Sequence, residues 1–168
     1  MRQQSAPEFI RNWNLQFPDQ LVIADELKEN KIEFEGFDLL TVKVGHSDTD
    51  YTTCLSVPSI GLVVAGDVAY NDVHLYLAES NTQTRHEWIS ALDKIESLKP
   101  HAVIAGHKRP TNEDNPRIME QTRQYIRDFD KIAEITTTAL ELYNNMMKIY
   151  PDRINPGAFW RSAQAVKG

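Results

Sequence analysis

Two stretches in the first third of the chain alternate apolar and polar residues, the pattern that is typical of β-strands. The segment IEFEG at 32–36 and the run LLTVKV at 39–44 follow each other across a short turn and predict a hairpin. The runs at 51–57 and 60–66, separated by a proline and a serine, predict a second strand pair. Because the run at 60–66 is continuously apolar, we expect it to form a central strand that is buried on both faces.

Beyond residue 67 the spacing of apolar residues becomes helical. Apolar residues recur at helical spacing from Trp88 to Leu98, and Pro100 is expected to end that helix. The segment HAVIAGH at 101–107 then predicts one more strand. This order of helix and strand is typical of α/β or α+β architecture. Further helices are expected over 118–132, 135–149 and, with Asn155 as its cap, 155–160.

The composition favours one folded domain, because 168 residues of which 41% are hydrophobic suit one core. A net charge of −6 offers no basic surface to a polyphosphate backbone, so we expect no nucleic-acid partner. No run approaches the roughly 18 apolar residues of a membrane span, and the first residues lack the apolar core of a signal peptide. We therefore expect no membrane association and a cytoplasmic location. The single cysteine, Cys54, fits a reducing compartment.

Three of the predicted strands end in a glycine followed by a residue that can bind a metal. His46 follows LLTVKVG, Asp67 follows IGLVVAG, and His107 follows AVIAG. Neighbouring strands deliver their ends to a common edge of a sheet, so these side chains can converge although they are far apart in the sequence. Two imidazoles and a carboxylate suit zinc or non-haem iron and leave a coordination position for water or substrate. Alternatively, the histidines are surface or core residues and the aspartate caps a turn.

The ordered motifs GHSDTD, GLVVAGD and VIAGH resemble the C-terminal half of the metallo-β-lactamase superfamily. The resemblance covers roughly residues 31–127, and GDVAYNDVHLYLAE is similar to a sub-group of hydrolase-like members. It implies an α/β (α+β) fold that is half of an αββα sandwich, with one mixed sheet, helices on its outer face and extra C-terminal helices. We expect an N-terminal arm over 1–30, because its first residues lack clean periodicity, then the half-domain over 31–134 and a helical extension of the same domain over 135–168.

The resemblance assigns roles to the candidate residues. It implies that His46 binds a first metal, that Asp67 bridges two metals and that His107 binds the second. A water activated by the metal attacks an ester, thioester or similar bond of a small-molecule substrate in that family. We therefore expect Asp67 and His74 to be catalytic, and the cofactor to be zinc, manganese or iron, with at most one ion per chain or none. The alternative for His74 is that it packs in the core or faces solvent beside a turn.

Two nearby carboxylates, Asp48 and Asp50, have two open interpretations. They can support the ligand histidines through hydrogen bonds, as carboxylates often do around metals, or they can satisfy the amides of their own loop.

The chain departs from the family because it lacks the His-x-His-x-Asp-His motif of the N-terminal half. Half of a sandwich would leave an apolar sheet face exposed, and soluble monomers seldom tolerate a large face of this kind. We therefore expect a homodimer formed through the inner sheet face. A separately encoded N-terminal half, or the terminal segments of the chain itself, are the alternative covers.

Two functions remain open at this point. The first is a metal-dependent hydrolase with a reduced metal site made by His46, Asp67 and His107. The second is a truncated, non-catalytic relative that serves as an interaction or scaffold protein, or one half of a split enzyme. The presence of all three ligand positions favours the enzyme, because loss of function would not spare those positions preferentially.

Overall fold

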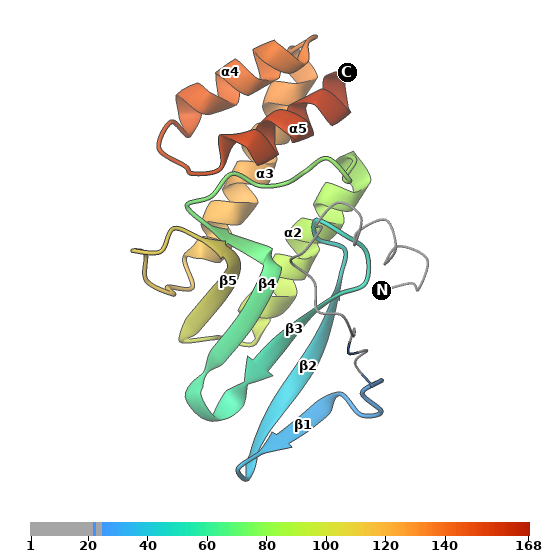
Figure 1. Cartoon of the computed structure of the whole chain (residues 1–168), viewed down its shortest axis with the longest axis vertical. Coiled ribbons are helices and arrows are strands. Elements are labelled where there is room, and N and C mark those ends of the chain that lie inside the picture. Colours follow the sequence, from blue (N-terminus) through green and yellow to red (C-terminus); the bar gives the residue numbers. More distant parts are fainter. Residues whose placement is uncertain (1–21, 23–24) are drawn as a thin grey trace.

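Five strands form one mixed sheet in the computed structural model of the chain, which describes residue 22 and residues 25–168 (Figure 1). Most of the expected N-terminal arm at 1–30 lies outside the described residues. The order of the strands in the sheet follows the chain, and all neighbours are antiparallel except the last two, which are parallel. The strands are β1 (Lys31–Phe34), β2 (Phe37–Gly45), β3 (Thr52–Val57), β4 (Leu62–Asn71) and β5 (Ala102–Lys108).

Both predicted strand pairs are confirmed, and each is joined by a tight turn. Phe34 pairs with Phe37, so Glu35 and Gly36 alone connect β1 to β2. Both turn residues have positive φ angles, 51° and 82°, as a type I′ hairpin turn requires. A short 3-10 turn (Pro58–Ile60) connects β3 to β4.

Four α-helices follow the first four strands in the described part of the chain. The first of them lies between β4 and β5 in sequence and begins with a capping box, in which the Asn81 side chain accepts a hydrogen bond from the Thr84 backbone N–H. No described helix combines the length and the hydrophobicity needed to cross a membrane. The helices are α2 (Thr82–Ser97), α3 (Ile118–Ile135), α4 (Ala139–Ile149) and α5 (Pro156–Lys167).

Two helix boundaries differ from the expectation. The helix expected over 135–149 begins only at Ala139, because the Thr138 side chain accepts a hydrogen bond from the third N–H of α4 and so caps it. The last helix continues to Lys167. Asn155 occupies the predicted N-cap position in a left-handed conformation, but its side chain makes no capping hydrogen bond.

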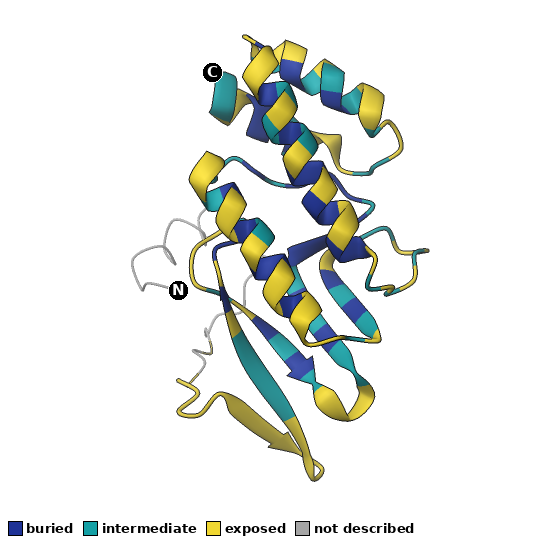
Figure 2. Ribbon diagram, turned by 180° about the vertical axis from the view of Figure 1, so that it is seen from behind, coloured by how far each residue is buried: buried dark blue, intermediate teal, exposed yellow. Residues whose placement is uncertain are grey.

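Helices α2 and α3 lie on the same side of the sheet, as the view from behind shows (Figure 2). In β4, Val63 and Ala65 are buried, whereas Leu62 and Val64 alternate with them and are partly exposed. The expectation that this strand is buried on both faces is therefore wrong. β4 lies between β3 and β5, but described helices cover only one of its faces. A mixed sheet with helices on one face confirms the expected fold class.

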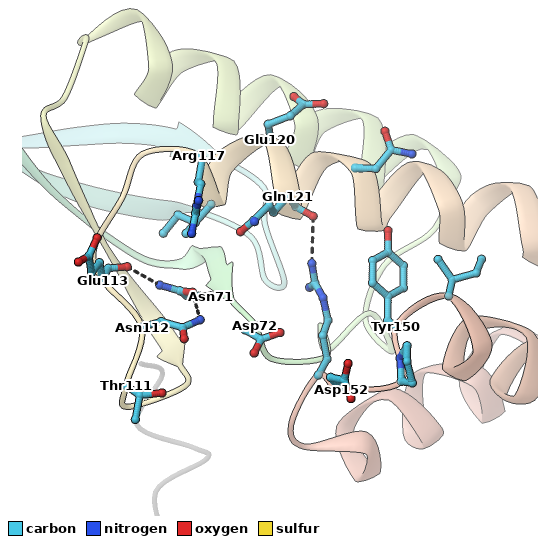
Figure 3. Close-up of a pocket in the computed structure, with 15 residues that line it drawn as sticks. Asn71, Asp72, Thr111, Asn112, Glu113, Arg117, Glu120, Gln121, Tyr150 and Asp152 are labelled. Carbon is cyan, nitrogen blue, oxygen red and sulfur yellow. Dashed lines mark hydrogen bonds between the residues drawn. The ribbon is translucent and has the colours of Figure 1, made fainter.

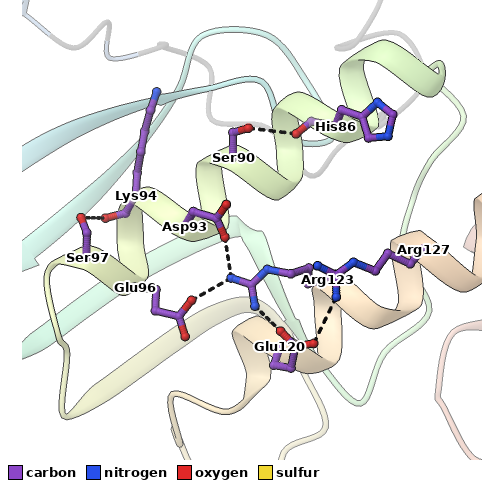
Figure 4. Close-up of polar contacts among 9 residues, drawn as sticks. All are labelled: His86, Ser90, Asp93, Lys94, Glu96, Ser97, Glu120, Arg123 and Arg127. Carbon is purple, nitrogen blue, oxygen red and sulfur yellow. Dashed lines mark hydrogen bonds and ion pairs between the residues drawn. The ribbon is translucent and has the colours of Figure 1, made fainter.

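Arg123 of α3 links the two helices that cover the sheet (Figure 4). Its side chain is 7% exposed, and its Nη2 lies 2.8 Å from Asp93 Oδ1 and 2.9 Å from Glu96 Oε2 of α2. It also pairs with Glu120, one turn earlier in α3. Burial by itself lowers the pKa of the guanidinium, but the surrounding carboxylates raise it overall. Arg123 therefore remains charged at the contact between α2 and α3.

Replacing Arg123 with methionine should keep the buried stem and remove the charge from three carboxylates that are each more than half exposed. We expect the free energy of unfolding to fall by about 1 kcal/mol, since solvent screens exposed partners. Arg127→Met is the matched control, because Arg127 makes only a long, half-exposed pair with Glu120 at 3.4 Å. Urea unfolding of both variants checks this, and equal effects would contradict it.

Candidate functional site

The three predicted ligands lie at one end of the sheet. β2, β4 and β5 run in the same direction, because two antiparallel steps separate β2 from β4. His46 directly follows β2, whereas Asp67 and His107 lie inside β4 and β5, which extend beyond their glycines. Asp67 Oδ1 is 3.3 Å from His107 Nε2, and both side chains are about half exposed. The structure thus brings two of the three predicted ligands into contact.

Gly106 allows Asp67 to approach β5. A Cβ atom at position 106 would lie 2.4 Å from Asp67 Oδ1 and 2.9 Å from the carbonyl carbon of Gly66. Neither gap accommodates a methyl group. The glycine before His107 therefore leaves the space that the Asp67 side chain and the Gly66 backbone occupy.

His46 is buried and is held by a carboxylate. Its Nδ1 lies 2.8 Å from Asp50 Oδ1, so Asp50 makes the hydrogen bond to this histidine that one of its two interpretations expected. A carboxylate accepts a hydrogen bond, so Nδ1 carries a proton, and in the neutral ring Nε2 is then the nitrogen with the lone pair. That Nε2 is buried and has no hydrogen-bond partner among the described residues. A carboxylate that holds the other ring nitrogen in this way is typical of metal-binding histidines.

Tyr70 and Asp48 complete the surroundings of Asp67. The Tyr70 ring stacks on His107 with ring centroids 5.0 Å apart. Its hydroxyl is buried and has no partner among the described residues. Burial, followed by the negative charges of Asp48 and Asp67, raises the pKa of Tyr70, so the hydroxyl keeps its proton. Burial and the charge of Asp67 likewise raise the pKa of Asp48.

Sequence reasoning did not place Tyr70 at the site. The residue lies directly opposite His107 in the ladder between β4 and β5. The register of this ladder shifts between Gly66 and Tyr70, so simple alternation along β4 does not predict which residue faces His107. The parallel pairing of the two strands was the missing information.

No protein-family model and no curated protein sequence matches the chain. Solved structures do match it. A metallo-β-lactamase family protein from Thermus thermophilus has a TM-score of 0.58 and 18% identity, over 83% of this chain and 46% of its own. A β-lactamase domain protein from Burkholderia ambifaria has a TM-score of 0.60 and 13% identity, over 95% and 52%. A metallo-β-lactamase from Pontibacter korlensis has a TM-score of 0.50 and 14% identity, over 75% and 56%.

The described chain has half of a metallo-β-lactamase fold. The chain spans about half the length of these structures. The resemblance carried by the three motifs is thus confirmed at the level of the fold, which is what identities this low can show.

The half-domain carries residues that can bind a metal, but its described residues do not form a complete ligand set. No three histidine, cysteine, aspartate or glutamate side chains of the described residues form a group that could hold a metal ion. Asp67 and His107 are in contact, and His46 presents a free nitrogen at the same end of the sheet. The donor chemistry therefore fits zinc, whereas the described geometry supplies only part of the four ligands that zinc usually takes.

His74, the other predicted catalytic residue, lies in a buried aromatic cluster of this half-domain. Its ring stacks on Phe159 with centroids 5.4 Å apart, and its Nδ1 lies 2.9 Å from the Tyr125 hydroxyl. These contacts match the alternative of core packing, and its catalytic role stays a prediction. Burial, followed by the charge of Arg153, lowers the pKa of His74 to about 4.

A polar pocket of about 830 Å³ lies beside α3 (Figure 3). It is lined by the end of β4, by residues 111–113 after β5, by Gln121 and its neighbours on α3, and by residues 149–153 from the end of α4 onward. None of the three predicted ligands lines it. The pocket is therefore separate from the candidate metal ligands of the half-domain.

The lowered pKa of His74 predicts how stability depends on pH. An unfolded chain protonates this histidine near pH 6.5 and the native chain only near pH 4, so the unfolded state binds more protons between these values. The free energy of unfolding should therefore fall as pH drops from about 6.5 to about 4, by up to about 3 kcal/mol from this residue. Urea unfolding over that range measures the slope.

The variant His74→Leu should flatten this part of the pH profile, whatever its effect on stability at neutral pH. His86→Leu, at an exposed position on α2, is the control and should keep the slope. A His74→Leu profile with the slope of the parent protein would show that His74 is not the group responsible.

Proposed function

We propose that this chain provides part of the active site of a metal-dependent hydrolase that cleaves an ester, thioester or similar bond, with His46, Asp67 and His107 as metal ligands. The observation that carries the proposal is the state of His46. Its Nε2 is buried and has no partner among the described residues, while Asp50 holds the other ring nitrogen. A buried polar atom without a partner costs free energy, and a bound ion would remove that cost.

The side chains around the three proposed ligands also support a metal site at this end of the sheet. Asp50 sets the tautomer and orientation of His46, and Gly106 leaves the space that Asp67 occupies. Tyr70 packs against His107, and its buried hydroxyl stays protonated under the influence of the Asp67 charge. A divalent ion held here would lower the pKa of a water molecule to near neutrality and polarise the bond to be cleaved.

The proposed ligand set is incomplete in this chain alone. The family resemblance places the remaining ligands in a His-x-His-x-Asp-His segment, which the sequence lacks. We therefore propose that the chain binds one ion at most, and weakly, and that a segment with further imidazoles would strengthen the binding. Zinc, manganese and iron are the candidates, because all three accept mixed imidazole and carboxylate ligands.

Metal binding tests this proposal. The chain, purified without chelator and then equilibrated with zinc, should retain up to one equivalent by elemental mass spectrometry. The double variant His46→Ala/His107→Ala should lose it. Asp50→Ala should weaken zinc affinity by about 10- to 100-fold, because the carboxylate acts only through His46. Hydrolysis of an aryl ester or thioester should appear only in the metal-loaded protein.

The matched control is the double variant His86→Ala/His101→Ala, which removes two exposed histidines outside the site. It should keep the metal. Equal loss in both double variants would identify adventitious binding, and absence of binding in the parent chain would favour the non-catalytic alternative.

A further inference from the structure

The sheet carries a second apolar face, on the side away from α2 and α3. Two rows of side chains cross it, because the strand registers align them. The first row consists of Thr41, Leu55, Val64 and Ile104. The second consists of Ile32, Leu39, Val57, Leu62 and Ala102. These nine residues are called the open face below.

Described residues leave the open face without a covering layer. Figure 1 looks onto this side of the sheet, and the view from behind in Figure 2 places α2 and α3 on the other side. None of the nine residues belongs to the buried core cluster, and all are partly or fully exposed. The core members of the same strands, such as Cys54, Val63 and Val103, alternate with them and face the helices.

We propose that the open face is a two-fold interface with a second copy of this chain. A two-fold interface places the same patch on both partners, so the patch must be complementary to itself. The nine residues carry no charge, and the charged residue that follows them on this side of β2 is Lys43. Two copies, each with a net charge of −6, can therefore pack through the open face without bringing negatively charged side chains against each other.

The size of the open face fits a dimer of modest stability. Five strands at about 4.8 Å spacing and about 20 Å of strand length give a flat area on the order of 500 Å². Phe34 and Phe37, which are 61% and 57% exposed at the β1–β2 turn, extend it. Specific interfaces bury roughly 800 Å² per partner, so the open face lies near the lower limit. We therefore expect dimerisation that depends on concentration.

Sedimentation equilibrium of the full chain tests the proposal, over about a hundredfold range of concentration and in the presence of a chelator. The expected result is a transition from the 19.3 kDa monomer to a species of twice that mass. The chelator makes the outcome independent of the proposed metal site, so either proposal can fail without the other.

The variant Val64→Glu places a charge in the middle of the open face and should raise the dissociation constant at least about a hundredfold, since two like charges would be buried against each other. Leu140→Glu is the matched control: it adds the same charge at an apolar residue of α4 that is 58% exposed, and should still dimerise. Circular dichroism checks that both fold. If Val64→Glu does not fold, Thr41→Lys serves in its place.

Three results would overturn the proposal. They are a monomer at every concentration, a dimer that Val64→Glu and Thr41→Lys leave intact, and assembly into larger species. If the full chain is a monomer, a variant without residues 1–24 tests whether that segment prevents dimerisation. If the shortened chain dimerises where the full chain does not, that segment and not a second copy occupies the open face.

Discussion

The parallel pairing of β4 with β5 is the constraint on which the rest of the structure depends. Two parallel strands cannot be joined by a tight turn, so the chain must cross over between them, and α2 forms part of that crossover. The same pairing places Asp67 beside His107 and Tyr70 opposite it. The hydroxyl of Thr122 then connects the backbone of Tyr70 to α3. The core and the candidate site therefore share one strand.

The buried polar atoms that lack a partner in the described chain are few, and two of the three belong to the candidate site. They are His46 Nε2, Tyr70 OH and His74 Nε2. An unpaired buried polar atom is costly, so its location is informative. At His46 the atom is the one that we propose binds a metal ion, and at Tyr70 it lies in the ring that stacks on His107. At His74 the cost appears instead as a lowered pKa inside an aromatic cluster.

The one-sided sheet explains why the sequence pattern of β4 was misleading. A continuous apolar run normally indicates a strand covered on both faces. Here the described helices cover Val63 and Ala65, while Leu62 and Val64 are apolar without a described covering layer. The continuous apolar run of β4 therefore reflects two apolar faces of the sheet, and described helices cover only one of them. The other is the open face, where we propose that a second copy packs.

Features that depend on neighbours along the chain were determined by the sequence itself. The β1–β2 hairpin, the strand pairs, the order of helices and the three glycine-flanked candidate ligands are of this kind, because turn residues and hydrophobic spacing act locally. Tertiary structure alone decided that Asp67 meets His107 and that Tyr70 stacks against it, since these contacts depend on the register between two strands that are distant in the sequence. It also decided that His74 is buried against Phe159, because this contact depends on α5, which is distant from His74 in the sequence.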